Sequence, residues 1–92
     1  MSDQLKHDIN IAAYNLSQQH HPYDTLCWML AERELYIQYN FQKPKREEVK
    51  QKAAEIFFSN PSYDVLCWLI SEKNIIFKGK MFKKGTKPTF YV

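Results

Sequence analysis

Apolar side chains recur along the first forty residues at the spacing of an α-helix. Leu5, Ile9, Ala12, Ala13 and Leu16 place one apolar stripe on one helical face. The stripe stops at His20-His21-Pro22, because proline cannot continue a helix. The stretch from about Tyr23 to Asn40 then opens with residues 26–31, which are apolar almost all round, as in a central, buried helix. The pattern predicts two helices joined by a short turn.

The next part of the chain shows the same order of signals. Val49, Ala53, Ile56 and Phe57 form a second stripe, which predicts that all four side chains face the core. It ends at Asn60-Pro61-Ser62, where Asn60 is expected to be the N-cap of a helix from about Ser62 to Asn74. The pattern therefore predicts a second pair of helices.

The two pairs are copies of one unit. Shifting the chain by 40 residues, without a gap, superimposes two Tyr-Asp-x-Leu-Cys-Trp hexamers, which begin at Tyr23 and Tyr63. The identical pairs are Ala13 and Ala53, Tyr23 and Tyr63, Asp24 and Asp64, Leu26 and Leu66, Cys27 and Cys67, Trp28 and Trp68, and Glu32 and Glu72. Cys and Trp are rare residues, so this agreement indicates a tandem duplication. Repeat one spans residues 1–40 and repeat two spans residues 41–77.

The C-terminal part departs from the repeat. Residues 75–82 and 89–92 are rich in β-prone side chains and flank a segment that contains Gly85. Two such runs around a glycine-containing turn favour a β-hairpin, here a basic one over residues 75–92. We therefore predict a single α+β domain, mainly α, over residues 1–92. It would consist of two tandem helical hairpins closed by a C-terminal β-hairpin.

Charge is unevenly distributed along the chain. The net charge is +3 at pH 7, but residues 1–72 hold seven Lys or Arg against ten Asp or Glu. Residues 73–92 hold six lysines and no acid. Lysines that alternate with aromatic rings can bind nucleic acid or an acidic partner, through phosphate contacts and base stacking. The candidate residues for that role are Lys78, Lys80, Lys83, Lys84 and Lys87. The alternative is that these lysines only protect an edge strand from aggregation.

The repeated Cys-Trp pair is expected to be structural. Trp28 and Trp68 would anchor the core, with a shared aromatic platform for a ligand as the alternative. Cys27 and Cys67, flanked by Leu and Trp, should be buried free thiols. Neither cysteine has metal-ligand spacing to the other or to His20-His21, so no metal site is predicted.

The repeated Tyr-Asp pair, Tyr23-Asp24 and Tyr63-Asp64, lies where each second helix begins. An aspartate there complements the helix dipole, and the same four side chains are candidates for binding a partner. Glu32 and Glu72 could bond the tyrosine or the facing helix, or form a pair of carboxylates at a pseudo-twofold axis, but the chain contains no phosphate-binding loop or nucleophile motif. No catalytic residue and no cofactor are predicted, and an enzyme is not expected.

Residues 9–35 resemble a widespread family of short bacterial helical domains of unknown function, whose pattern is Ile-x-x-x-Ala-Tyr followed by Trp-Leu-x-Ala-Glu-x-Glu-Leu. The matching residues are Ile9, Ala13, Tyr14, Trp28, Ala31, Glu32, Glu34 and Leu35. In repeat two, Ala54 replaces the tyrosine and Ser71 the alanine, and the usual glycine-rich turn is His-His-Pro here. The resemblance implies a helical hairpin and no particular activity.

These observations favour a small, non-enzymatic interaction module, of the regulator or inhibitor type, that binds a protein partner. The alternative is a nucleic-acid-binding accessory protein that uses the basic C-terminal tail. No apolar run approaches the roughly 20 residues of a membrane span, so no membrane role is expected. The first twenty residues contain no apolar signal-peptide region, which favours a cytoplasmic protein, as expected for a phage or bacterial regulator.

Overall fold

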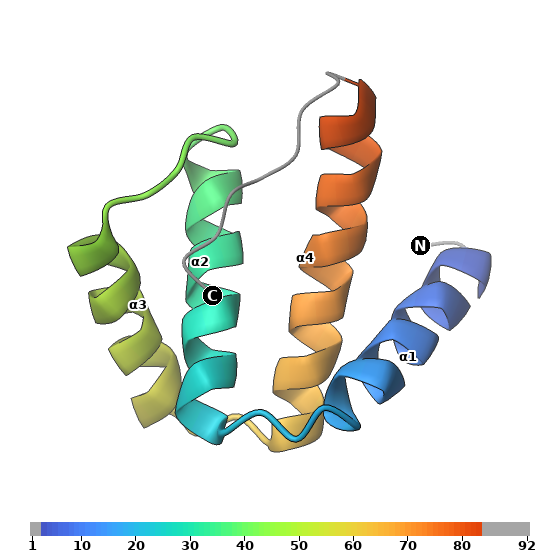
Figure 1. The fold of residues 1–92 in the computed structure, drawn as a ribbon, viewed down its shortest axis with the longest axis horizontal. Helices are drawn as coiled ribbons and strands as arrows, with labels where there is room; N and C mark the ends of the chain where they lie inside the picture. Colours follow the sequence, from blue (N-terminus) through green and yellow to red (C-terminus); the bar gives the residue numbers. More distant parts are fainter. Residues whose placement is uncertain (1–2, 84–92) are drawn as a thin grey trace.

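The computed structural model describes residues 3–83, with side chains through Lys78, and shows four α-helices (Figure 1). They are α1 (Asp3–Ser17), α2 (Tyr23–Gln38), α3 (Arg46–Ser59) and α4 (Tyr63–Lys83). The second helix of each repeat begins at the same repeat position, Tyr23 or Tyr63. None of these helices combines the length and the apolar character that crossing a membrane requires.

The turn inside each repeat has the same backbone conformation in both copies. His20 and Asn60 occupy equivalent positions, and both have φ 55°, in the left-handed region. The backbone N–H of Asn60 donates to the carbonyls of Ile56 and Phe57, so Asn60 is the C-cap of α3. The expectation that Asn60 caps the following helix is therefore wrong. Ser62 takes that place, since its hydroxyl accepts from the Val65 N–H at 3.2 Å.

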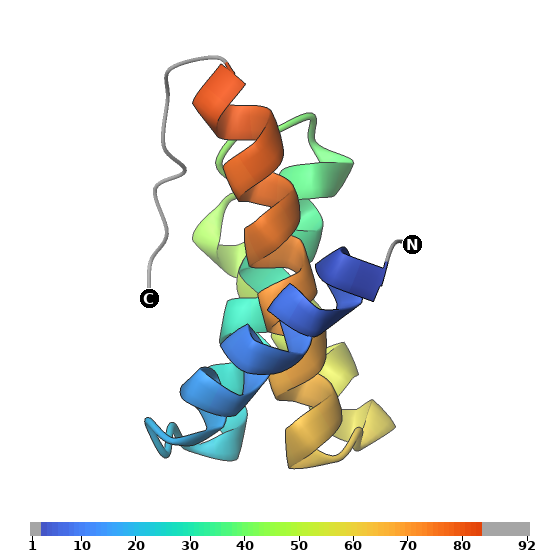
Figure 2. The same cartoon turned by 90° about the vertical axis from the view of Figure 1, so that its right-hand side faces the viewer.

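The prediction of two tandem helical hairpins is wrong, because the two helices of each repeat do not pack against each other. The first helix of each repeat packs against the second helix of the other: α1 against α4, and α3 against α2. The two second helices, α2 and α4, pack against each other at the centre. Figure 1 shows the resulting order α3, α2, α4, α1, and Figure 2 shows α1 lying across α4. Within the described residues, the backbones of α1 and α2 do not come close, and neither do those of α3 and α4.

The core lies between helices that belong to different repeats. Its main cluster joins three helices and contains Leu16, Leu26, Cys27, Met29, Leu30, Leu66, Cys67 and Ile70. A second cluster buries Val49 of α3 against Ala31 and Leu35 of α2. Both clusters therefore combine side chains from the two repeats. Burial of this apolar surface is the main stabilising contribution, so each half depends on the other for its core.

The predicted α+β class is wrong for the described residues, which form helices and no strand: residues 75–83, expected to begin a β-hairpin, continue α4. Phe77 follows Leu66 and Ile70 on the same helical face and is buried. Its ring packs edge-on against Tyr36 of α2 and Phe41 of the α2–α3 connection, with centroids 5.8 Å apart in each case. Burial of Phe77 at this position outweighs the β propensity of the segment and the roughly 1 kcal/mol cost of Gly79 in a helix. Residues 84–92, with the rest of the predicted hairpin, lie outside the described residues.

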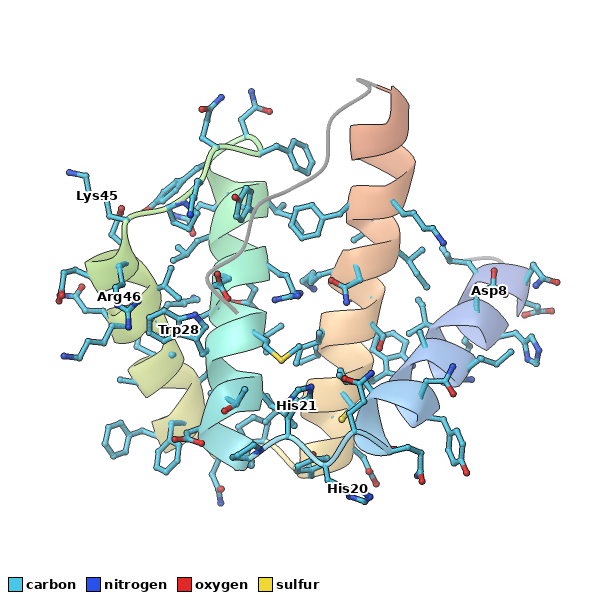
Figure 3. The ribbon with its side chains drawn as sticks, in the orientation of Figure 1. Asp8, His20, His21, Trp28, Lys45 and Arg46 are labelled. Carbon is cyan, nitrogen blue, oxygen red and sulfur yellow. The ribbon has the colours of Figure 1, made fainter. Side chains whose placement is uncertain are left out.

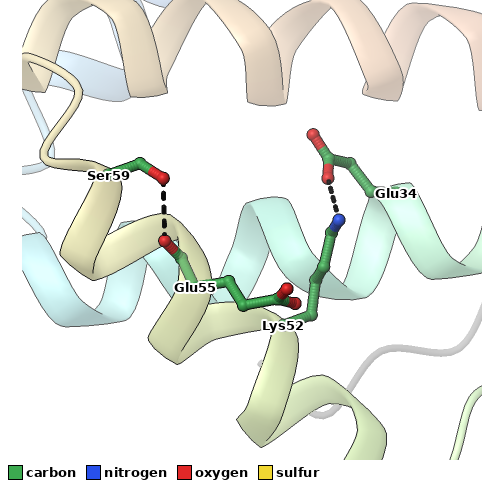
Figure 4. A network of polar contacts seen from close by, with 4 residues as sticks. All are labelled: Glu34, Lys52, Glu55 and Ser59. Carbon is green, nitrogen blue, oxygen red and sulfur yellow. Dashed lines mark hydrogen bonds and ion pairs between the residues drawn. The ribbon is translucent and has the colours of Figure 1, made fainter.

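Polar contacts also join α2 to α3. Lys52 of α3 forms an ion pair with Glu34 of α2, with 3.6 Å between Nζ and Oε2 (Figure 4). Near the start of α3, the Tyr39 hydroxyl donates to Glu48, whose other carboxylate oxygen accepts from the Lys45 backbone N–H at 3.1 Å. The Glu48 carboxylate, in the first turn of α3, therefore binds both the end of α2 at Tyr39 and the backbone that precedes α3 at Lys45.

Removing the Glu48 charge should change how stability depends on pH. The hydrogen bond from Tyr39, followed by that from the Lys45 N–H, lowers the pKa of Glu48 from 4.5. A lowered folded-state pKa stabilises the fold above the unfolded-state pKa, and this contribution is lost as the pH falls through the folded-state pKa. Glu48→Gln should therefore lower Tm at pH 7, and its difference from the parent should shrink as the pH falls below about 4.5.

Thermal unfolding followed by circular dichroism from pH 7 to pH 3 measures this difference. Glu55→Gln, which removes an exposed carboxylate from the same helix, controls for the loss of one negative charge. A gap between the Glu48→Gln variant and the parent that stays constant over this range would show that the carboxylate contributes nothing through its ionisation.

Candidate functional site

Two equivalent hydrogen bonds close the interface between the repeats. The Tyr23 hydroxyl donates to the carbonyl of Pro61, and the Tyr63 hydroxyl donates to the carbonyl of His21 at 2.7 Å. Donors and acceptors are each 40 residues apart, so the two bonds are related by a pseudo-twofold arrangement. Burial, and then the nearby cysteine, raises the pKa of each tyrosine. Both tyrosines thus have structural partners, while Asp24 and Asp64 beside them are exposed.

A groove lies between α2 and α3 and has a volume of about 300 Å³. We call it the Trp28 groove; it is lined by Asp24, Cys27, Trp28, Lys50, Ala53, Ala54, Phe57 and Phe58. Two alanines on the α3 side leave room for a bound side chain, and aromatic rings stand beside them. A concave apolar site with a few polar groups at its margin is the usual form of a binding site.

The duplication produces a second groove between α1 and α4. This Trp68 groove has a volume of about 230 Å³ and is lined by Ala13, Tyr14, Ser17, Asp64, Cys67 and Trp68. Each of these residues is the repeat equivalent of a residue in the Trp28 groove. The two grooves are therefore copies of one surface.

The copies differ in their aromatic content. Phe57 and Phe58 in repeat two correspond to Ser17 and Gln18 in repeat one, while the exposed Tyr14 of repeat one corresponds to Ala54, so the Trp28 groove has three aromatic residues and the Trp68 groove two. The Phe58 side chain is 82% exposed and the Phe57 side chain 45% exposed. Their rings are in edge contact at 5.8 Å, and Phe57 also contacts Tyr23 at 5.6 Å. A contiguous exposed aromatic pair beside a groove is typical of an interaction surface.

The copies also differ in charge. Arg46 lies over the Trp28 ring, with Cζ 5.3 Å from the ring centroid, and Figure 3 shows the two side chains next to each other. Lys50 lines the Trp28 groove, whereas its equivalent, Asn10, accepts a hydrogen bond from Trp68 Nε1 at 3.0 Å. The Trp28 groove is thus the more aromatic and the more cationic of the two.

The sequence singled out Trp28 and Trp68, and the structure places both rings partly buried at the groove walls. Cys27 and Cys67 also line the grooves, and each is only 1% exposed. Of the basic tail, Lys78 is exposed on α4, and the side chains of Lys80 and Lys83 lie outside the described part. Lys84 and Lys87 lie outside the described residues altogether.

The two repeat-equivalent glutamates, for which a carboxylate pair was one option, have different surroundings. Glu32 is completely buried, whereas Glu72 is partly exposed and pairs with Lys73 at 3.0 Å. Beside Glu32, the buried Arg33 donates to the Met29 carbonyl and to Asn74 of α4, which joins α2 to α4. Burial lowers the pKa of Arg33 to about 10, so it remains protonated at neutral pH. Within residues 3–83 no cluster of three or more His, Cys, Asp or Glu side chains is arranged to hold a metal ion.

Sequence reasoning missed the part of the site contributed by α3. It assigned Phe57 to the core and gave Phe58, Arg46 and Lys50 no role. A signal was present in the repeat alignment, because Phe57 and Phe58 face a serine and a glutamine in the other copy. A position that is apolar in one copy and polar in the other is less constrained by a shared core.

Both cysteines should react slowly with thiol reagents in the folded protein. Burial, and then the charge of Asp24, raises the pKa of Cys27 above 9.0, and burial with Asp64 does the same for Cys67. A raised pKa lowers the thiolate fraction at neutral pH, and the thiolate is the reactive form. Labelling at pH 8 should be at least about tenfold slower without denaturant than in urea. Equal rates in the two conditions would show that the thiols are accessible in the native fold.

Comparison of the chain with protein-family models, with curated proteins and with solved structures finds no match. The resemblance of residues 9–35 to the family of short bacterial helical domains therefore stays a prediction.

Proposed function

We propose that this protein is a small, non-enzymatic interaction module that binds a protein partner at the Trp28 groove. The exposure of Phe58 at the rim of this groove is the observation that carries the proposal. Full burial of a phenylalanine side chain contributes about 1.5–3 kcal/mol, so a partner that covers Phe57 and Phe58 would gain a substantial part of its binding energy there. Aromatic side chains and arginine are also the residues that most often dominate binding at protein interfaces.

The chemistry of the groove supports binding rather than catalysis. Its ionisable groups are Asp24, Lys50 and Cys27, and the raised pKa of Cys27 disfavours the nucleophilic thiolate. The remaining lining residues are alanines and aromatics, which provide contact area. A regulator or inhibitor needs no more than such a surface.

The test is an affinity capture from the source cells with the tagged full chain. Phe57→Ser combined with Phe58→Gln places the repeat-one residues at these two positions of the Trp28 groove and should abolish capture of the specific partner. Phe58 is mostly exposed, and Phe57 is about half exposed with a ring contact to Tyr23, so the fold should be kept with a modest fall in Tm. Ile11→Gln is the matched control: Ile11 is 49% exposed outside the groove, and repeat two has Gln51 at the equivalent position.

Retention of every partner by the double phenylalanine variant would show that this groove is not the binding surface. Titration of the full chain with duplex DNA across a salt series tests the alternative function, which would use Lys78 and the other C-terminal lysines. Binding that weakens steeply with salt would favour a nucleic-acid-binding protein instead.

A further inference from the structure

The Trp28 groove has two chemically different ends. Figure 1 shows α2 and α3 running in opposite directions, so the start of α3 lies beside the later part of α2. Arg46, Lys50 and Ala54 follow one another at intervals of four residues along one face of α3, and Phe57 and Phe58 lie one turn further on. The cations therefore stand at one end of the groove. Asp24, at the start of α2, stands at the other end with the exposed phenylalanines.

The cationic end is suited to a carboxylate. Lys45, Arg46 and Lys50 are all exposed there, and the exposed acid beside them is Glu47. The Glu48 carboxylate already accepts hydrogen bonds from Tyr39 and from the Lys45 backbone. The first turn of α3 also carries Glu47 and Glu48, so Lys45, Arg46 and Lys50 exceed the acids around them by one charge, and the helix N-terminus adds a favourable field for an anion. A positive patch of this kind selects a complementary negative partner.

The middle of the groove is suited to one bulky apolar side chain. Ala53 and Ala54 present methyl groups, with the Trp28 and Phe57 rings beside them. An apolar side chain placed here would be covered by aromatic surface without leaving a buried polar atom of its own unpaired. The groove therefore combines an apolar site with a cationic end, in a fixed direction along α3.

We propose that the Trp28 groove binds a short acidic peptide segment of the partner. The segment carries a bulky apolar residue that sits over Ala53 and Ala54, and an Asp or Glu on the side of Arg46 and Lys50. This inference rests on the proposed function and names the chemistry of the partner. The Trp68 groove binds the same segment more weakly, since it has Ser17, Gln18 and Asn10 in place of Phe57, Phe58 and Lys50, and Tyr14 in place of Ala54.

A library of random 12-residue peptides displayed on phage, selected on the full chain, supplies the probe. Enriched peptides are expected to combine a large apolar residue with Asp or Glu. A synthetic copy of the most enriched peptide, labelled with a fluorophore, then gives Kd by anisotropy. Arg46→Glu combined with Lys50→Glu should weaken its binding roughly tenfold or more, because two attractions become repulsions. Lys6→Glu is the matched control, since Lys6 is exposed and is the repeat equivalent of Arg46, and it should leave Kd unchanged.

Three results would overturn the inference: no enriched peptide, enriched peptides that are basic, or an equal loss of affinity in the Lys6→Glu variant. Displacement of the peptide by a single-stranded oligonucleotide would assign the surface to nucleic acid instead. Circular dichroism checks that each variant folds. If the double glutamate variant does not fold, Arg46→Gln combined with Lys50→Gln replaces it, and this variant should lose less affinity, in the same direction.

The two proposals fail in different ways. If Phe57→Ser with Phe58→Gln abolishes capture of the cellular partner while the charge reversal does not weaken it, the groove binds a protein but the acidic segment is wrong. If the phenylalanine variant keeps both the partner and the peptide, the proposed function fails as well.

Discussion

Severing the chain after Asn40 is expected to leave two fragments that fold only in each other's presence. The first helix of each repeat packs on the second helix of the other repeat, so a single repeat lacks the surface that covers its own apolar residues. Val49 of α3, for example, is buried against Ala31 and Leu35 of α2. Isolated helices of 14–16 residues, the lengths of α1, α2 and α3, are marginal in water.

Fragments of residues 1–40 and 41–92 test this expectation. Circular dichroism and sedimentation velocity should find each fragment mostly unfolded as a monomer, and an equimolar mixture should regain the helicity of the intact chain as a 1:1 complex. One fragment could also form a dimer with itself, because the two repeats have the same contact positions and a second copy would cover the same apolar residues. A fragment of residues 1–40 that is fully helical as a monomer would contradict the exchanged arrangement.

Truncation of either central leucine should be strongly destabilising. Leu26 and Leu66 are repeat equivalents, each 0% exposed, and both lie in the main core cluster. Leu→Ala at such positions costs about 2–5 kcal/mol, through lost burial and the cavity left behind. In a domain of this size, that corresponds to a Tm lowered by at least about 8 °C.

Urea unfolding of the two single variants measures these costs, which should be similar because the two environments are copies. Val65→Ala is the control: Val65 precedes Leu66 on α4 but is 46% exposed, and its truncation should cost about 0.5 kcal/mol or less. A loss below about 1 kcal/mol for either leucine variant would show that the interface between α2 and α4 is not a close-packed core.

The sequence predicted one part of the candidate site and not another. The repeat alone indicated that Trp28 and Trp68 occupy equivalent environments, and the structure places them in two equivalent grooves. It could not indicate that Phe57 faces outward, because the apolar positions of α3 are compatible with a buried face that includes Phe57 and with one that excludes it. Packing of α3 on α2 decides this: Val49 faces the core, and Phe57 and Phe58 lie at the edge of the contact.

For residues 75–83, the local sequence did not decide between a strand and a helix. This segment is compatible with a strand or with a helix, since Ile75, Ile76 and Phe77 are β-prone, but Phe77 also lies seven residues after Ile70, on the same helical face. The choice falls to the helix because Tyr36 and Phe41, more than 30 residues earlier in the chain, provide a pocket for Phe77. No local propensity contains that information.

The sequence by itself determined the 40-residue duplication, the positions of the helices through residue 74 and the turns between them. These features depend on periodicity and on backbone preferences that act over a few residues, such as the breakers at Pro22 and Pro61. Only the tertiary structure decided which helices pair, because the apolar stripes of α1 and α3 fit either second helix equally well as patterns. The short turns within the repeats carry each first helix onto the opposite repeat. That exchange also decides which aromatic side chains remain exposed for a partner.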